Sequence, residues 1–298
     1  MATAELSVVV PSVNGFGDLA GTLEALERQR DDVSLEVLVV DRLGEALRRE
    51  VQAAFPLVRV LDVAPGTTIP EMRAIAFRAA TAPSVAVIED HVLVPPGWAR
   101  ALLTAQSDAT PVVAGAVENA ATTSPVDWAA FLCEYSHCTP PLPEGNVEWL
   151  TGNNIVYPRA LLEQFRAVVE SGGWENRLHD AFRAGKIPLT CRPDIVVGHK
   201  MHYTVGLYMS QRYLYSRSYA GARAEGASLA KRMAMGMASL ALPPLLFWRT
   251  VSRIRAKGRH REELRRSLPL LALFVVAWAA GEAVGYIAGS GDSLSRVR

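Results

Sequence analysis

The apolar positions of the N-terminal half fall into short continuous runs, with helical spacing between them. Leu19, Leu23 and Leu26 recur at the spacing of one helix face, and residues 43–55, 70–81 and 96–107 follow similar patterns. The continuous runs are LSVVVPS (6–12), LEVLVVD (35–41), VRVLDV (58–63), SVAVIED (84–90) and PVVAGAV (111–117). Buried strands alternating with helices predict an α/β fold with a mostly parallel sheet covered on both faces.

The pattern changes along the second half of the chain. Residues 118–205 are less regular, with helices expected over 159–169 and 174–186 and a strand over 187–200. From Met233 onward the chain becomes strongly apolar. We therefore predict a sheet domain over residues 1–225 and a membrane-associated region over residues 226–298.

Two apolar segments lie in this C-terminal region. The first, 233–248, is short and contains Pro243 and Pro244, whereas the second, 267–289, exceeds the roughly 20 residues that span a bilayer. A basic linker, 249–266, joins them. We favour a re-entrant or interfacial first segment and a single transmembrane span over 267–289; a two-span hairpin is the alternative.

The net charge of +1 over 298 residues hides a local excess of basic residues. Residues 249–266 contain eight Lys or Arg against two Glu. Basic residues beside apolar runs favour a membrane surface as partner, and no nucleic acid is expected, because the folded part is not basic.

Cys133, Cys138 and Cys191 lack metal-type spacing, and Met1 to Glu5 lack a basic signal-peptide region. We therefore expect a protein of the cell membrane whose catalytic part is cytoplasmic.

Polar residues at the carboxyl ends of the expected strands are the first candidates for a site, because such sheets bind ligands there. They are Asn14, Asp41, and Glu89 to His91. No GxGxxG follows the first strand, and no GxxxxGK[ST] occurs in the chain. A dinucleotide site or P-loop is therefore not expected.

These strand ends, taken in order, resemble the family 2 inverting glycosyltransferases of the GT-A fold. VVVPSVNG (8–15) has the proline, Pro11, and an asparagine, Asn14; VLVVD ends on the expected acid, Asp41. EMRAIAFRAATAP (71–83) keeps the arginine, Arg73, of an Arg-Asn pair, with Ala74 in place of the asparagine. IEDHVLVPPGW (88–98) keeps the frame of the Asp-x-Asp strand, with Glu89 and His91 at its acidic positions.

Three later segments extend the resemblance over about residues 5–225. TGNNIVYPRALL (151–162) is similar to the acceptor-side Gly-Asn segment, which would place Gly152, Asn153 and Asn154 beside the acceptor. GGWENRLHDAFRAGK (172–186) is similar to the acidic catalytic segment, with Glu175 and Asn176 where Glu-Asp is usual. VVGHK (196–200) resembles the strand-end histidine that can bind the metal.

The resemblance implies transfer of a sugar from a nucleotide-diphosphate sugar, with a divalent metal that stabilises the leaving group. Glu89, His91 and His199 would be the metal ligands, and this mixture of oxygen and nitrogen favours Mn²⁺ over Mg²⁺. Asp90 is expected on the opposite face of the strand, although it could replace a ligand. The alternative for Glu89 and His91 is an ordinary surface hydrogen bond.

An inverting transfer needs a general base for the acceptor hydroxyl. Glu175 is the first candidate and Asp180 the substitute, although an acid in a first helical turn is also favoured by the helix dipole. The donor would contact Pro11, Asn14, Asp41, Arg73, Glu89 and Asp90.

Some of these roles have plain structural alternatives. Asp41 could instead cap the following helix, and Arg73 could lie on an exposed helix face rather than pair with a diphosphate. Asn153 and Asn154 could be ordinary turn residues. Arg212, in YMSQRYLYSRSYAGARAEG (208–226), is the remaining acceptor-side candidate.

The resulting hypothesis is a membrane-anchored glycosyltransferase with a lipid-linked or cell-surface glycan acceptor. A second hypothesis is a catalytically degenerate protein that binds nucleotide sugars. A nucleotidyltransferase is the third, because NGFGD (14–18) is a weak version of the loop such an enzyme needs.

Overall fold

A computed structural model describes residues 4–298 as two compact units. The sheet unit comprises the residues up to Ala120 and Cys138–Lys200; the helical unit comprises Ala121–His137 and Met201–Arg298. Residues 201–225, expected in the sheet domain, group with the C-terminal helices in this division. The expectation of no signal peptide rests partly on residues 1–3, which lie outside the described range.

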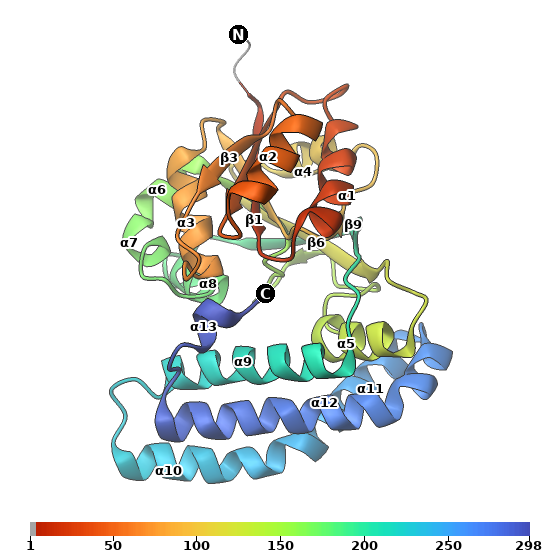
Figure 1. Ribbon diagram of the computed structural model, residues 1–298, viewed down its shortest axis with the longest axis vertical. Coiled ribbons are helices and arrows are strands. Elements are labelled where there is room, and N and C mark those ends of the chain that lie inside the picture. Colours follow the sequence, from red (N-terminus) through yellow and green to blue (C-terminus); the bar gives the residue numbers. More distant parts are fainter. Residues whose placement is uncertain (1–3) are drawn as a thin grey trace. The chain divides into compact units, whose positions relative to one another are not determined.

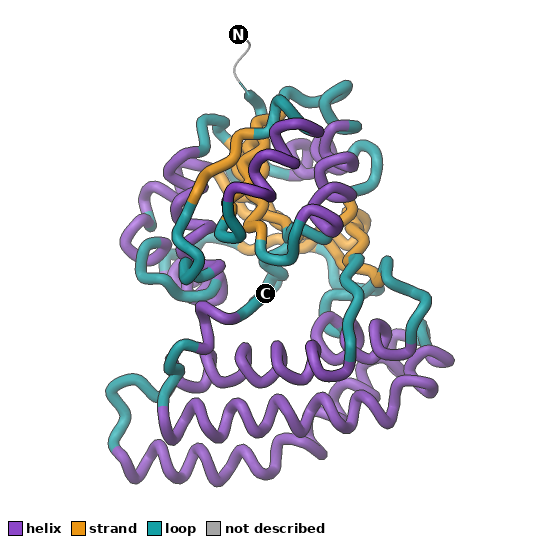
Figure 2. Tube along the Cα trace, in the orientation of Figure 1, coloured by secondary structure: helices purple, strands orange, loops and turns teal. Residues whose placement is uncertain are grey.

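The sheet unit confirms the α/β prediction with a mixed sheet (Figures 1 and 2). Within residues 4–298, the order is β3-β2-β1-β4-β8-β6-β9-β5, and β7 pairs with β9. The bounds are β1 Leu6–Ser12, β2 Leu35–Asp41, β3 Arg59–Asp62, β4 Ser84–Ile88, β5 Val92–Leu93, β6 Val112–Asn119, β7 Gly145–Asn146, β8 Asn154–Pro158 and β9 Leu189–His199.

The expected parallel pairing holds for the first four strands and for β6 with β9. β8 differs, because it lies between β4 and β6 and is antiparallel to both. All of β1 and β4 is buried, which is why their sequences are nearly continuous apolar runs.

Helices connect these strands. Their bounds are α1 Phe16–Glu27, α2 Glu45–Ala54, α3 Ile69–Ala79, α4 Trp98–Ala105, α6 Arg159–Gln164, α7 Arg166–Val169 and α8 Glu175–Ala184. Thr68 and Glu71 form a capping box that fixes the start of α3. The single helix expected over 159–169 is instead interrupted at Phe165.

The helical unit contains α5 (Pro125–Tyr135), α9 (Val205–Arg223), α10 (Leu229–Ala238), the 3₁₀ turn η1 (Ser239–Ala241), α11 (Leu242–Lys257), α12 (Arg261–Ala288) and α13 (Ser293–Arg296). α12 packs closely along α9: a Cβ at Gly285 would meet the Arg217 carbonyl oxygen at 2.5 Å. Pro243 and Pro244 lie in the first turn of α11, where a missing N–H leaves no helical bond unmade.

Among the described residues, α12 is the one helix long and apolar enough to cross a membrane. Within its most apolar 18-residue window, 44% of the residues are buried in the structure. Length and composition alone give weak support for membrane association, because the core helix of a soluble protein meets the same criteria.

Candidate metal and donor site

The turn that follows β4 places three potential metal ligands together. β4 ends at Ile88, and Glu89, Asp90 and His91 form the turn into β5. β5 then pairs antiparallel with β9, with Val92 opposite His199. This register brings the last residue of β9 beside the turn.

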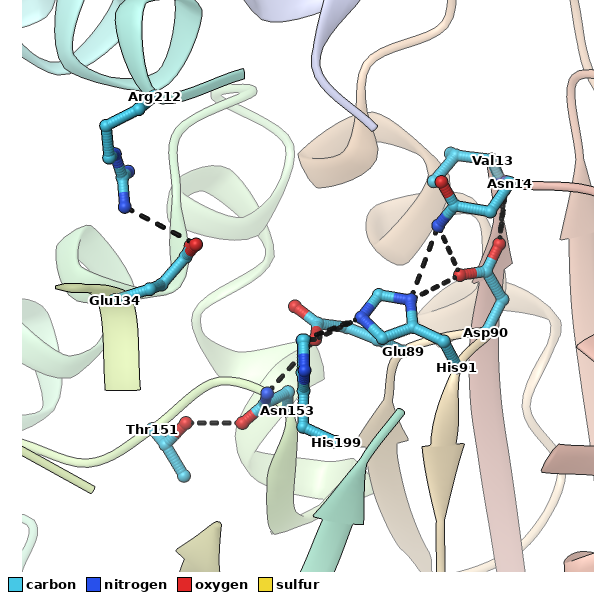
Figure 3. A network of polar contacts seen from close by, with 10 residues as sticks. All are labelled: Val13, Asn14, Glu89, Asp90, His91, Glu134, Thr151, Asn153, His199 and Arg212. Carbon is cyan, nitrogen blue, oxygen red and sulfur yellow. Dashed lines mark hydrogen bonds and ion pairs between the residues drawn. The ribbon is translucent and has the colours of Figure 1, made fainter. Parts of the chain in front are cut away.

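Glu89, His91 and His199 converge there, with their ligand atoms within 4.8 Å of one another (Figure 3). The two histidine Nε2 atoms are 2.8 Å apart. Glu89 Oε2 lies 3.4 Å from His91 Nε2 and 3.7 Å from His199 Nε2. Both imidazoles are buried, and the carboxylate of Glu89 is partly accessible.

These separations fit a shared cation. Two ligands at right angles on a metal with bonds of about 2.1 Å lie about 3.0 Å apart, close to the distances seen here. One carboxylate and two imidazoles form a donor set that suits Mn²⁺ and other transition metals better than Mg²⁺. The cluster therefore has the chemistry of a divalent metal site.

Asp90 supports this cluster from behind. Its Oδ2 accepts the backbone N–H groups of Val13 (2.7 Å) and Asn14 (2.9 Å), and its Oδ1 accepts the Asn14 side-chain amide at 2.8 Å. Asp90 Oδ1 also lies 2.9 Å from His91 Nδ1. A carboxylate so placed holds the proton on Nδ1, which directs His91 Nε2 toward Glu89 and His199.

The electrostatics of the cluster follow from burial and these contacts. Burial alone would lower the pKa of His91, but hydrogen bonds and charges from Asp90 and Glu89 raise that pKa to about 10. Burial raises the pKa of Glu89, but hydrogen bonding and charge from His91 outweigh it and hold the pKa well below its usual range. Burial and the charge on His91 lower the pKa of His199 to about 3. A positive charge thus resides on His91 in the absence of a metal. A bound divalent cation would supply that positive charge instead.

The Gly-Asn-Asn segment before β8 contacts the same corner. Asn153 donates its side-chain amide to Glu89 Oε2 at 3.0 Å, and its own oxygen accepts the Thr151 hydroxyl. Asn154 does not contact this corner and stabilises the sheet instead. Its oxygen accepts Trp98 Nε1 at 2.9 Å, and its amide donates to the carbonyls of Ala116 and Ile195, both at 2.9 Å. The amide of Asn154 is therefore fully engaged in the fold.

A second charged pair joins α3 to the start of α8. Arg73 Nη1 lies 2.8 Å from Glu175 Oε2, and both side chains are largely buried. Gly152 lies against the same carboxylate, since a Cβ there would meet Glu175 Cδ at 2.5 Å. The pair lines a cavity together with Tyr157 and Trp174. Arg73 thus orients Glu175 rather than pointing to solvent.

The remaining candidates have other surroundings. Asp41 accepts the N–H groups of Leu43 (2.8 Å) and Gly44 (3.1 Å), which fixes the turn before α2. It does not cap the helix, because the N-cap of α2 is Gly44 and no side chain caps it. Pro11 is buried within β1, and Asp180 pairs with Arg183 at the surface of α8. Arg212 belongs to the helical unit, where it pairs with Glu134 at 3.4 Å. The ligand-binding roles expected for these residues stay predictions.

Sequence reasoning missed the supporting groups. Thr151 was not expected near the metal corner, and the Arg73–Glu175 pair joins residues 102 positions apart. The local sequence around Arg73 contains no signal for a partner that distant. Asp90 was expected to point away from the two ligands, but its contact with His91 Nδ1 was not.

Comparisons with known proteins agree with the fold. The family model described as Glycosyl transferase family 2 matches residues 7–148. A mannosyltransferase from Pyrobaculum calidifontis, solved in complex with GDP-Man and Mn²⁺, is similar at 17% identity and a TM-score of 0.51, covering 96% of this chain and 75% of its own. Residues 1–349 of S. aureus TarS match at 14% identity and a TM-score of 0.52, covering 92% of this chain and 91% of that one. No curated protein sequence matches the chain.

Proposed function

We propose that this chain, whose residues 7–148 form a glycosyl transferase family 2 domain on a GT-A fold, transfers a sugar from a nucleotide-diphosphate donor with inversion. The observation that supports this most directly is the convergence of Glu89, His91 and His199 where β4 ends. A diphosphate leaving group needs positive charge at this position of the sheet. The solved mannosyltransferase holds both a nucleotide sugar and Mn²⁺.

Glu89, His91 and His199 would hold the divalent cation, Mn²⁺ in preference to Mg²⁺, through one oxygen and two nitrogens. The cation supplies neutralisation of the charge that develops on the leaving diphosphate. Asp90 and Asn153 hold the ligands in position: Asp90 through His91 Nδ1, and Asn153 through Glu89 Oε2. Asn14 and Asp41, at the ends of β1 and β2, are the proposed contacts for the rest of the donor.

Glu175 is the proposed general base. Its carboxylate lines a cavity, its Oε2 accepts from Arg73, and Oε1 lies beside the Cα of Gly152, where no side chain intervenes. An acceptor hydroxyl that reaches this carboxylate would lose its proton to it as the oxygen attacks the anomeric carbon. Asp180 is the weaker candidate, because its carboxylate faces solvent and pairs with Arg183.

The proposed acceptor is a lipid-linked or cell-surface glycan, and the proposed location is the cytoplasmic side of the cell membrane. The apolar helix α12 and the basic residues that precede it support this part of the proposal. A membrane-held catalyst meets lipid-linked acceptors without having to extract them from the bilayer.

Donor hydrolysis tests the enzyme against the alternative of a degenerate binding protein. Purified full-length protein is incubated with a panel of nucleotide sugars and Mn²⁺, and released nucleoside diphosphate is measured. We expect release that EDTA abolishes and added Mn²⁺ restores, and a His199→Ala variant that Mn²⁺ does not rescue. A His202→Ala variant is the matched control, because His202 lies in the helical unit and is exposed.

Two results would change the conclusion. Binding of nucleotide sugar and Mn²⁺ without release of product would favour the degenerate binding protein. Absence of release, metal binding and nucleotide binding together would exclude a glycosyltransferase.

A further inference from the structure

The helical unit exposes a continuous apolar stripe along α10, η1 and the first turns of α11. Leu229, Met233, Met237, Leu240, Leu245 and Trp248 are all exposed and recur every three to five residues. The first three, four residues apart on α10, share one face of that helix. Met237, Leu240 and Trp248 are 61%, 69% and 65% exposed. We define these six residues as the apolar stripe.

The inner side of α10 carries one large apolar residue, Met235, which packs against Ala220, Ala224 and Tyr286. The buried position of the helix is Gly236, where a Cβ would meet Ile287 Cγ1 of α12 at 2.6 Å, and Ser239 of η1 is also buried. A surface helix of a water-soluble protein turns its large apolar residues inward and its polar residues outward. On α10 three large apolar residues, Leu229, Met233 and Met237, are exposed and one packs inward, which indicates that the exposed side of the helix contacts something other than water.

The free side of α12 continues this surface. Phe274, Trp278, Gly281 and Gly285 contact α9, which defines one face of α12. Leu273, Val276 and Ala280 lie away from that face by the 100° turn per residue, and they are exposed. In Figure 1 α12 lies between α9 and α10. Leu273 and Val276 of α12 are exposed, as the residues of the apolar stripe are.

α9 opposes a membrane-spanning arrangement of α12. Arg212 lies over the Trp278 ring at 4.4 Å, Arg223 pairs with Glu282 at 3.0 Å, and Arg217 donates to the Gly289 carbonyl at 3.2 Å. α9 therefore runs beside α12 from Phe274 to Gly289 and carries three arginines there. If α12 crossed the bilayer in this packing, those arginines would enter the hydrocarbon region, where charged side chains are costly.

Basic side chains accompany the apolar stripe: one lies on α10, and the others lie on α11 and the first turns of α12. They are exposed and comprise Lys231, Arg249, Arg255, Arg261, Arg265 and Arg266. A second copy of the chain seated on the same face would set these basic residues against one another. Anionic lipid headgroups would instead match them, because each basic residue near such a surface strengthens binding.

We propose that the helical unit binds anionic membranes in the plane of the interface, with the apolar stripe and the exposed side of α12 in the lipid, and that α12 does not span the bilayer. Its apolar length then reflects burial between α9 and the lipid surface. This inference goes beyond the transfer reaction, and its tests do not use activity.

The first test measures binding of the full chain to vesicles of phosphatidylcholine with and without phosphatidylglycerol. We expect the triple variant Met237→Gln/Leu240→Gln/Trp248→Gln to bind at least about tenfold more weakly, because three apolar side chains leave the lipid. Leu57→Gln, which changes a 68% exposed leucine of the sheet unit, should bind like the wild type. Omission of phosphatidylglycerol should weaken binding several-fold, and equal binding to both vesicles would overturn the electrostatic part.

The second test distinguishes an α12 that lies in the plane of the membrane surface from an α12 that spans the bilayer. Arg265→Cys and Ala288→Cys mark the two ends of α12, about 35 Å apart at a rise of about 1.5 Å per residue; the native cysteines are buried. Each variant is treated with a membrane-impermeant maleimide in spheroplasts and in inside-out vesicles. In-plane binding predicts that both ends react in the same preparation, and labelling of opposite ends in the two preparations would overturn the proposal.

A third outcome concerns a protein partner. If the full chain sediments as a dimer, the triple variant as a monomer, and neither binds vesicles, the stripe is a contact between copies. That result would also overturn the membrane proposal.

Discussion

Among the described residues of the sheet unit, exposed large apolar side chains are few and scattered: Leu43, Leu57 and Trp149. In the helical unit, nine such residues lie on α10, η1, α11 and α12 among the residues described. Scattered exposed leucines are normal on any protein surface, whereas a contiguous group indicates a partner or a membrane. The apolar surplus of the chain is therefore confined to one unit.

Both units bury charged residues: in the helical unit Asp127 and Arg212 are buried and paired, with His202 and Glu134. What differs is that the sheet unit buries charged groups as a cluster of potential metal ligands. In the sheet unit, Asp90, His91 and His199 are buried together near strand ends, with Arg73 buried nearby on α3. Charged groups are buried at such cost only when they are paired or when they bind a ligand. A buried cluster of charged groups thus indicates a reaction site in the sheet unit, and a group of exposed apolar side chains indicates a docking surface in the helical unit.

The largest expected effect separates the two acids of α8. We expect Glu175→Gln to lower sugar transfer by about 10²–10⁴-fold, because the amide cannot accept the acceptor proton, while Mn²⁺ and donor binding stay unchanged. Transfer of labelled sugar into membranes, with the donor identified by hydrolysis, measures the loss. Asp180→Asn is the control and should retain transfer, because its carboxylate pairs with Arg183 at the surface.

A larger loss of transfer in Asp180→Asn than in Glu175→Gln would contradict the comparison of the two units. If Asp180→Asn loses transfer and Glu175→Gln retains it, the buried pair with Arg73 is structural, and the base lies on the exposed side of α8. Buried charged side chains near the sheet would then not indicate where the transfer reaction takes place.

A smaller effect is expected at Gly152, which lies against Glu175 in the same cavity. A Cβ at this position would meet Glu175 Cδ at 2.5 Å, so Gly152→Ala must displace the carboxylate from Arg73. We expect a loss of about 1–3 kcal/mol in unfolding free energy and a fall in kcat larger than any change in donor KM. Urea unfolding and steady-state kinetics measure these two quantities.

Gly17→Ala is the matched control in the same unit, because a Cβ there meets no atom within 4 Å. It lies within α1 and should be neutral or stabilise by up to about 1 kcal/mol, since alanine favours helix. Equal behaviour of the two variants would show that contact between Gly152 and Glu175 has no consequence.

Sequence patterns predict the sheet unit well where burial is complete on both faces. The runs in β1, β2 and β4 match the structure because a strand buried on both faces favours apolar residues at nearly every position. The antiparallel placement of β8 could not be predicted, because its own five residues do not specify whether β4 and β6 become its neighbours. Pairing direction is a property of the whole chain.

The candidate site, too, was predicted from the sequence only in part. The resemblance brought Glu89, His91 and His199 together, and the structure places their ligand atoms within 4.8 Å. It did not indicate that Arg73 pairs with Glu175 or that Asn154 binds Trp98, because such contacts depend on packing between distant elements. For 233–248, the apolar run was evident, but only the structure places its large side chains at the surface.

The smallest expected effect tests the comparison most directly, because the same substitution is made in both units. Met72 is fully buried in α3 and Met237 is exposed on α10. Met237→Gln should change the unfolding free energy by no more than about 0.5 kcal/mol in detergent-free buffer, since its side chain packs little. Met72→Gln should cost about 2–5 kcal/mol, because it removes apolar contacts and buries an amide. If both variants lose stability equally, the stripe on α10 contributes to the folded core, and the difference between the two units disappears.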